Sequence, residues 1–470
     1  MDLSIPAMDL FLSSSNCSTV RFANLYYRSP APLRRRTFAV RSTALPFPNH
    51  KAKYFRELQA AVDVVERACR LCLDVTSPVK SSLSAKSDGR IVEKNDQTPV
   101  TVADFGVQAL VSLGLFSVDE ISHLRWNQTF THIALVLVVT ELGKLFPSIP
   151  LVAEEDSAFV RSNNLVEPVV NAVTGCSSSI DKSWTEADVL EAIDRGGKDA
   201  FVFCTKPATY WVLDPIDGTR GFLKGTEALY VESSIKHLKL AQNGFDFEIL
   251  IEVGLALVVD GEIVLAVMGC PNWKEDLRNK SISEVQGYKN ILSESGIVMV
   301  AHLGCGTWAR RLIFERQDTI NVPHSWTRCF VDHYSLVHEA RFCIPESQTW
   351  DSLPLSALFS ATTDANSIGD NQILLLPQCC GSLCKYLMVA SGRASVFILR
   401  TRDEKTIKAW DHAAGIICVH EAGGQVSDWE GYQIDLTADQ TERRIIFPLG
   451  GVLVTNGTLH NQIIEIIYRV

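Results

Sequence analysis

The start of this 470-residue chain is nearly free of acidic residues. Between positions 10 and 56 it has no Asp or Glu, while arginines recur among serines and threonines: Arg21, Arg28, Arg34, Arg35, Arg36 and Arg41. This composition is typical of an organellar transit peptide, and the segment lacks the continuous apolar core of a secretory signal. We therefore expect residues 1–53 to be a disordered transit peptide that directs the protein to a mitochondrion or chloroplast. The alternative is a basic tail that stays attached.

Long apolar runs and a disulfide framework are lacking as well. The run Ile133–Val139 is far too short to span a bilayer, so we expect no membrane association. The 13 cysteines are scattered through a large chain, which argues against a disulfide framework. Cys69 and Cys72 fall at helical spacing with apolar neighbours, so core packing is their expected role. A redox response stays open for one further group, which has no His or second pair to support zinc: Cys379, Cys380 and Cys384.

Positive charge is scarce outside the first segment. Lys and Arg outnumber Asp and Glu by six in residues 1–53, which leaves −16 on the rest of a chain whose net charge is −10. Such an acidic body repels a long nucleic acid along its whole backbone, so this class of partner is excluded. A nucleotide that binds here is expected to be a small molecule.

Two carboxylates stand three residues apart directly after an apolar strand. Asp214 and Asp217 flank Pro215, which cannot donate to a strand ladder and therefore predicts a turn. A turn can bring both carboxylates to one side, where hard oxygen ligands suit Mg²⁺. Gly218 and Thr219 then begin a predicted helix, whose free N–H groups can hold an anion.

Two further acidic clusters follow the same pattern. Leu151–Asp156 is an apolar strand that ends in acids, and Trp410–Gly415 begins an amphipathic segment with Asp411 in its first turn. Two metal ions about 3.5–4 Å apart need shared anionic ligands. Three carboxylate clusters at the ends of elements therefore predict a polynuclear Mg²⁺ site.

Four motifs give the chain a resemblance to a known family. They occur in the family's order and span most of residues 54–470: Thr98–Phe105, Val152–Glu155, Asp214–Thr219 and Trp410–Gly415. With these motifs the chain resembles the inositol monophosphatase superfamily of Mg²⁺-dependent, lithium-sensitive phosphatases. The Trp-Asp-His-Ala-Ala-Gly form, Gly304–Trp308 and Gly381–Tyr386 are similar to the 3′(2′),5′-bisphosphate nucleotidase branch.

The resemblance implies both a fold and a reaction. The fold is an α+β layered αβαβα sandwich, expected here as an N-terminal α+β domain (54–298) and a C-terminal α/β domain (299–470). The reaction is hydrolysis of the 3′-phosphate of adenosine 3′,5′-bisphosphate to AMP and phosphate, with 3′-phosphoadenylyl sulfate as a further substrate. The alternatives are an inositol phosphate phosphatase and a catalytically inactive relative that binds nucleotide or a protein partner.

The resemblance also assigns the metal ligands. It implies two or three Mg²⁺ ions. Glu154, Asp214 and the carbonyl of Ile216 resemble the ligands of the first, and Asp214, Asp217 and Asp411 resemble those of the second.

The remaining site residues follow from the same resemblance. Asp104 and Thr219 resemble the pair that orients and deprotonates the attacking water. We interpret His412 as a packed or hydrogen-bonded histidine without a catalytic role. The residues implied on the substrate side are Gly218, Thr219, Ser382, Lys385 and Arg400.

The periodic segments predict several elements around these motifs. Helices are expected at 54–75 and from near Asp104, and strands 253–259 and 262–268 are expected to form a hairpin through Asp260 and Gly261. A strand at 394–399 precedes a helix at 411–421, which two glycines end: Gly423 and Gly424.

Two segments depart from the family pattern. Residues 114–140 interrupt a helical pattern, and residues 232–252 interrupt a strand pattern. Insertions are usually tolerated at exposed loop tips rather than inside elements. We interpret both segments as untranslated sequence retained in the gene model; genuine divergent loops are the alternative.

Overall fold

The computed structural model describes a folded body with gaps between its described stretches. These stretches all belong to one unit, Phe38–Val470. They comprise residues 45–48, 51–76, 91–93, 99–116, 149–175, 184–197, 202–204, 206–219, 251–273, 296–312, 325–345, 347–362, 371–376, 381–401 and 406–469.

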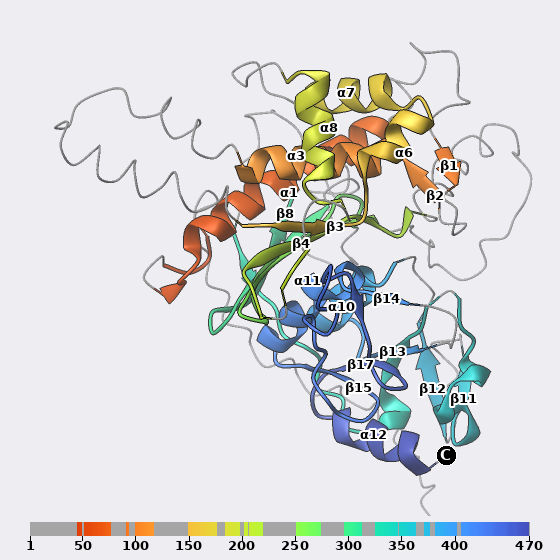
Figure 1. Ribbon diagram of the computed structural model, residues 1–470. Helices are drawn as coiled ribbons and strands as arrows, with labels where there is room; N and C mark the ends of the chain where they lie inside the picture. Colours follow the sequence, from red (N-terminus) through yellow and green to blue (C-terminus); the bar gives the residue numbers. More distant parts are fainter. Residues whose placement is uncertain are drawn as a thin grey trace, which may run out of the picture. The chain divides into compact units, whose positions relative to one another are not determined.

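A seven-stranded sheet forms the first half of this body (Figure 1). Its strands follow one another in chain order, and all neighbours are antiparallel except the parallel first pair. The strands are β3 (Leu151–Ala153), β4 (Tyr210–Asp217), β5 (Glu252–Val259), β6 (Glu262–Cys270), β7 (Ile297–His302), β8 (Gly306–Arg311) and β9 (Thr327–Arg328).

A six-stranded mixed sheet forms the second half. Its order is β11-β12-β10-β13-β17-β15, with parallel pairing as far as β13 and antiparallel pairing beyond it. The strands are β10 (Arg341–Cys343), β11 (Ser360–Thr362), β12 (Gln372–Leu375), β13 (Val396–Arg400), β15 (Gln425–Asp428) and β17 (Gly451–Thr455). Two short pairs lie apart from both sheets: β1 (Ile91–Glu93) with β2 (Pro99–Thr101), and β14 (Ile407–Lys408) with β16 (Ile445–Ile446).

Helices complete five layers. Those on the outer face of the seven-stranded sheet are α1 (Phe55–Thr76), α3 (Val102–Phe116), α6 (Ser157–Ser162), α7 (Val166–Gly175) and α8 (Glu186–Asp194). Between the sheets lie α10 (Leu383–Ala390) and α11 (Trp410–Glu421), and α12 (His460–Arg469) covers the far face of the six-stranded sheet. Short 3-10 turns are η5 (Val337–Glu339), η6 (Trp350–Ser352) and η7 (Pro354–Ala357). This αβαβα order confirms the predicted α+β fold class.

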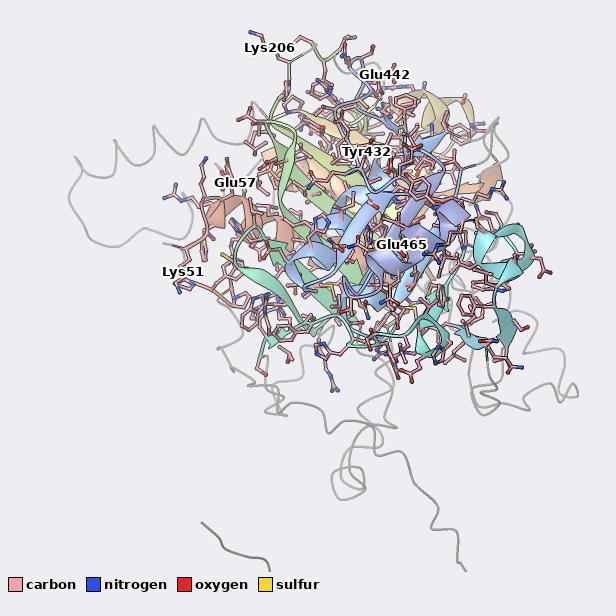
Figure 2. All side chains as sticks on the ribbon, turned by 90° about the horizontal axis from the view of Figure 1, so that it is seen from below. Lys51, Glu57, Lys206, Tyr432, Glu442 and Glu465 are labelled. Carbon is pink, nitrogen blue, oxygen red and sulfur yellow. The ribbon has the colours of Figure 1, made fainter. Side chains whose placement is uncertain are left out.

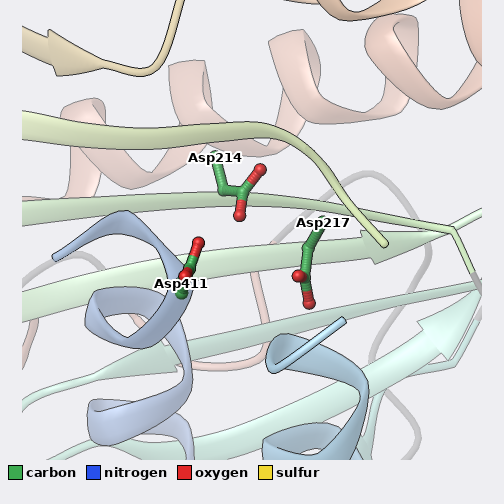
Figure 3. A group of neighbouring side chains, drawn as sticks. All are labelled: Asp214, Asp217 and Asp411. Atoms are coloured by element: carbon green, nitrogen blue, oxygen red, sulfur yellow. The ribbon is translucent and has the colours of Figure 1, made fainter. Parts of the chain in front are cut away.

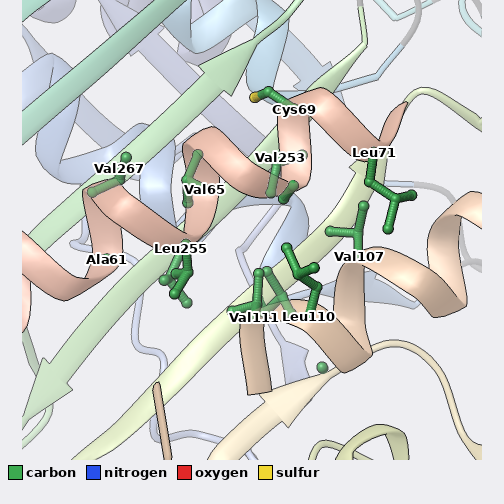
Figure 4. Close-up of a cluster of buried hydrophobic side chains, with 14 of the residues drawn as sticks. Ala61, Val65, Cys69, Leu71, Val107, Leu110, Val111, Val253, Leu255 and Val267 are labelled. Carbon is green, nitrogen blue, oxygen red and sulfur yellow. The ribbon is translucent and has the colours of Figure 1, made fainter. Parts of the chain in front are cut away.

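The helical spacing read from the sequence places the predicted side chains in the core. Cys69 and Cys72 on α1 are fully buried, as expected for core residues. Cys69 packs over Gly269 of β6, where a Cβ would lie 2.5 Å from the sulfur. Figure 4 shows α1 and α3 presenting Val65 and Val107 to the same apolar cluster.

The hairpin between β5 and β6 is also as predicted. Asp260 and Gly261 both have positive φ, at 52° and 90°, between the paired residues Val259 and Glu262. This left-handed pair matches the right-handed twist of the flanking strands.

The last residues of the predicted transit segment pack in the folded body, and the transit peptide itself stays a prediction. Leu45, Phe47 and Ala52 are buried in the apolar cluster under α1, and the ring of Phe47 lies 5.8 Å from that of His302. The described end of the segment, residues 45–48 and 51–53, therefore belongs to the core although its composition resembles that of a transit peptide. Residues 1–44 lie outside the described residues.

The predicted division at 298/299 falls inside β7. The seven-stranded sheet continues through β8 to Arg328, so a division by sheets would come between β9 and β10. The two-domain organisation stays a prediction. Both suspected insertions lie almost wholly outside the described residues: 114–116 continue α3, Ile251 is buried, and Glu252 begins β5.

Candidate metal centre

The predicted turn at Pro215 is wrong, and a β-bulge takes its place. Strand β4 continues through Pro215 to Asp217, with Asp214 opposite Gly254 and Asp217 opposite Glu252. Three steps along β4 therefore match two steps along β5. Side chains alternate along a strand, so residues three apart normally face opposite sides, and the extra residue cancels this alternation. The bulge also tolerates proline, which cannot donate to the ladder.

Three carboxylates meet at this end of the sheet (Figure 3). Oxygens of Asp214, Asp217 and Asp411 all lie within 4.8 Å of one another. The first two come from β4 and the third from the first turn of α11. Asp214 and Asp217 are only 2% and 6% exposed. The structure thus brings together carboxylates that are about 200 positions apart in the sequence, as the motif reading predicted.

Burial and mutual repulsion make this cluster electrostatically unfavourable when it is empty. Burial raises the pKa of Asp214 well above its usual range, and the charges of Asp217, Asp411, Glu154 and Asp104 raise it further. Burial and the charges of Asp217 and Glu154 likewise raise the pKa of Asp411. Because Glu154, which follows β3 directly, raises the pKa of both aspartates, it belongs to the same electrostatic cluster. A cation among these groups would remove the repulsion.

The donor set fits a hard divalent cation. Asp214 Oδ1 is buried and receives no hydrogen bond from any residue that the structure describes. All ligand atoms of the cluster are carboxylate oxygens. Oxygen ligands of this kind suit Mg²⁺, whereas zinc sites usually include nitrogen or sulfur ligands.

Asp217 is also fixed by the start of α10. Its carboxylate accepts backbone N–H groups from Ser382, at 3.0 Å, and from Leu383. Burial raises the pKa of Asp217, and the nearby Lys385 and these two N–H groups act in the opposite direction. Asp217 therefore joins the acid cluster to the N-terminus of α10.

Three of the predicted substrate residues have other contacts in the structure. The backbone N–H of Ser382 donates to the Asp217 carboxylate. Lys385 is 2% exposed, and its ammonium donates to the carbonyl of Gly381. Arg400 lies at the end of β13 and donates to the carbonyl of Ser352 at 2.7 Å. Contacts of these three side chains with substrate stay predictions.

The predicted water-activating pair is assembled beside the acids. The hydroxyl of Thr219 lies 3.2 Å from Asp104 Oδ1 and 3.0 Å from the carbonyl oxygen of Ile216, and either oxygen can accept a hydrogen bond from it. Asp104 Oδ2 accepts the backbone N–H and the hydroxyl of Thr101, at 2.7 and 2.6 Å. These bonds fix Asp104 and leave its other oxygen facing Thr219. Gly218 turns the chain between the two parts of the site with φ of 86°.

His412 has the structural role expected of it. It is 1% exposed, and its Nδ1 lies 2.7 Å from the Tyr386 hydroxyl. Burial lowers its pKa to about 3, so the ring is neutral near pH 7. Of the suspected redox group, Cys384 is buried, while Cys379 and Cys380 lie outside the described residues.

Sequence reasoning missed two buried side chains beside Glu154. Gln108 and Arg444 bond to the backbone on either side of it. No motif or period marked them, because their bonds go to backbone atoms far away in the sequence.

Comparison with known proteins identifies the family. The model of the inositol monophosphatase family matches residues 137–470. The chain belongs to this family. A protein of Arabidopsis thaliana named as a candidate mitochondrial 3′(2′),5′-bisphosphate nucleotidase is 57% identical over 450 residues, covering 96% of each chain. A 3′,5′-bisphosphate nucleotidase of the same plant is 30% identical over 436 residues, covering 88% of this chain and 96% of its own.

Solved structures are more distant. An IMPase of Thermotoga maritima covers 88% of this chain and 97% of its own, with a TM-score of 0.44 and 16% identity.

The family match confirms the resemblance predicted from the four motifs, and membership implies a metal-dependent enzyme. Within the described residues, no helix is long and apolar enough to cross a membrane.

Proposed function

We propose that this protein is a Mg²⁺-dependent phosphatase that removes the 3′-phosphate of adenosine 3′,5′-bisphosphate to give AMP and phosphate, and that it also accepts 3′-phosphoadenylyl sulfate. The observation that carries the proposal is a cluster of three carboxylates, two of them buried, next to a hydrogen-bonded Thr219–Asp104 pair. The names of the two Arabidopsis relatives support the choice of a bisphosphate nucleotide as substrate.

The carboxylates divide between two metal positions. Glu154, Asp214 and the carbonyl of Ile216 would hold one Mg²⁺, and Asp214, Asp217 and Asp411 would hold another, with room for a third left open. When bound, Mg²⁺ neutralises phosphate charge and makes a neighbouring water more acidic. The carboxylates would position the ions, and the burial of Asp214 and Asp217 keeps bulk water away from their charges.

Thr219 and Asp104 manage the proton of the attacking water. A water beside the Thr219 hydroxyl gives its proton to that oxygen as its own oxygen forms the new bond to phosphorus. Thr219 passes its proton to Asp104 Oδ1, which already lies within hydrogen-bond distance. Asp104 can act because Thr101 fixes its orientation through the other oxygen. The bond from phosphorus to the 3′-oxygen breaks, and that oxygen takes up a proton from solvent as it leaves as the nucleotide hydroxyl, while Asp104 returns its proton to solvent.

The substrate-side assignments remain part of the proposal. Backbone N–H groups at Gly218 and Thr219 would bind the phosphate that is cleaved. Ser382, Lys385 and Arg400 would act on the nucleotide side. Because Lys385 is a buried residue of α10, we place its charge close to Asp217 rather than at the open surface.

The localisation proposal follows the composition of the first segment. The relative with 57% identity carries a mitochondrial name, which supports a mitochondrion as the site of action. A chloroplast remains the second candidate.

Phosphate release from a substrate panel tests the function. Adenosine 3′,5′-bisphosphate, 3′-phosphoadenylyl sulfate, inositol monophosphates and inositol 1,4-bisphosphate are compared in Mg²⁺, with Asp214→Asn as the background control. We expect the highest kcat/KM for adenosine 3′,5′-bisphosphate. A higher value for an inositol phosphate would favour the inositol phosphate phosphatase, and turnover no greater than that of Asp214→Asn would favour an inactive relative.

A further inference from the structure

Arg444 joins two segments that carry predicted metal ligands. It is 9% exposed, and its guanidinium donates to the carbonyl of Ala153 at 2.6 Å and to that of Gly196 at 2.7 Å. Ala153 is the last residue of β3 and stands directly before Glu154. The same Gly196 carbonyl also accepts the backbone N–H of Ala153, at 3.0 Å. The chain at Glu154 is thus held firmly on its N-terminal side.

The other contacts of Arg444 reach the start of α11. Its guanidinium carbon lies 5.5 Å from the ring centroid of Trp410, and its own carbonyl accepts the backbone N–H of Ala409 at 2.8 Å. These two residues directly precede Asp411. Oε2 of Glu442 lies 3.5 Å from Nε of Arg444 and partly balances the buried charge of the guanidinium. One side chain therefore contacts the neighbours of both Glu154 and Asp411.

Gln108 holds the chain on the other side of Glu154. Its amide oxygen accepts the backbone N–H of Glu155 at 2.9 Å, and its amide nitrogen donates to the Glu155 carbonyl at 2.6 Å and to that of Ile193 at 2.8 Å. The side chain is fully buried, one helical turn after Asp104 on α3. Glu154 consequently sits between two residues whose backbones are both fixed by buried side chains.

We propose that Arg444, together with Gln108, is a positioning residue that sets the Mg²⁺ affinity of this site. A carboxylate binds a cation tightly only when its backbone holds it in the ligand geometry before binding. The planar guanidinium suits this task because it donates through two nitrogens in a fixed geometry to two carbonyls and lies over an aromatic ring at the same time. The inference rests on the proposed metal site but not on the identity of the substrate.

The neighbouring residue provides a matched control. Arg443 is also buried, and its guanidinium donates to the carbonyls of Thr437, Cys204 and Lys206. These bonds join two surface segments, near which Figure 2 labels Lys206 and Glu442. The described contacts of Arg443 include no neighbour of Glu154 or Asp411. Loss of either guanidinium should destabilise the fold, but only one loss should affect the metal.

Calorimetric titration of MgCl₂ into the EDTA-treated, dialysed full-length protein tests the proposal, with the melting temperature measured alongside. We expect Arg444→Lys to raise the Kd for Mg²⁺ by about 10- to 100-fold, the usual effect of losing a residue that orients a ligand. Arg443→Lys should lower the melting temperature by a similar amount and leave the Kd unchanged. Gln108→Met, which keeps the side-chain length but removes the donors, should also raise the Kd.

The outcomes separate the inference from the proposed function. Unchanged Kd in Arg444→Lys, or an equal rise in Arg443→Lys, would overturn the positioning role. If Arg444→Lys does not fold, Gln108→Met decides, and an unchanged Kd there has the same meaning. Wild-type protein that takes up no Mg²⁺ would instead refute the metal site itself.

Discussion

Two aspartates with buried side chains, Asp214 and Asp332, show how the surrounding donors and charges decide the role of the same residue type. The Asp332 side chain is 7% exposed and accepts hydrogen bonds from Arg341 at 3.1 Å, and from Ser395 and Asn456 at 2.6 Å each. Asp214 is buried as well, at 2% exposed, but its Oδ1 has no donor among the described residues, and its charged neighbours are other acids.

The difference separates a structural acid from a functional one. Donors satisfy Asp332, which therefore joins the connection after β9 to the six-stranded sheet. The fold leaves Asp214 with a charge that the protein itself does not compensate, and such a group is kept where a ligand completes it. Substitutions at the two positions should consequently have opposite effects: loss of activity at Asp214 and loss of stability at Asp332.

The largest effect is expected for Asp214→Asn. Activity should fall by at least about 10³-fold, because an amide supplies neither the charge nor the shared oxygens that two ions require. The metal-free variant should melt at a higher temperature than metal-free wild type, since a desolvated and repelled charge has been removed. Calorimetry in EDTA and a phosphate assay in Mg²⁺ measure both effects. A lower melting temperature would mean that Asp214 is stabilised like Asp332.

The Asp104–Thr219 pair should show the next largest effect. Asp104→Asn and Thr219→Ala should each lower kcat by about 10²–10⁴-fold with little change in KM. The double variant should be about as slow as the slower single variant, because the two act as one unit. Steady-state kinetics of all four proteins provide the test. Losses that multiply would show that the two residues do not share a proton path.

Asp332→Asn should affect stability rather than catalysis. Hydrogen bonds to a charged group contribute about 1.5–3 kcal/mol, so the free energy of unfolding should fall by about that amount. Urea unfolding measures this loss, and kcat should stay at the wild-type value. A large fall in kcat with unchanged stability would contradict the contrast with Asp214.

The smallest expected effect is a pH dependence of the free energy of unfolding, which comes from the buried His460. His460 bonds to Ser427 at 2.9 Å and to Thr455 at 3.0 Å, and burial lowers its pKa to about 4. Between about pH 6.5 and that value the unfolded chain binds a proton that the folded protein does not, so stability falls as the pH drops through this window. Urea unfolding at several pH values should show a shallower decline for His460→Gln. Identical slopes for the two proteins would exclude this source.

The sequence predicted best what depends on local patterns. The α1 spacing, the Asp260–Gly261 hairpin and the layered fold followed from periodicity, turn chemistry and the family motifs. The Asp104–Thr219 contact spans 115 positions and was predicted only because motif order implied it.

The rest depended on tertiary context. Pro215 was interpreted as a turn because proline usually ends a strand, whereas pairing with β5 keeps it within a bulge. The burial of Lys385 was not predicted, because nothing in the sequence shows that α10 is buried on nearly all sides. Arg444 bonds to a carbonyl 291 positions away, and no sequence period records such a contact.

The bulge in β4 has a consequence for how this gene can vary. Deletion of a single codon between those for Asp214 and Asp217 would restore regular pairing with β5 and leave the two carboxylates two residues apart, still on one face of the strand. The sheet would gain a regular ladder, but the backbone of the bulge, which carries the Ile216 carbonyl as a proposed metal ligand, would change. Selection for stability alone would favour that shorter strand, so persistence of the extra residue in a population would itself be a sign that catalysis is under selection.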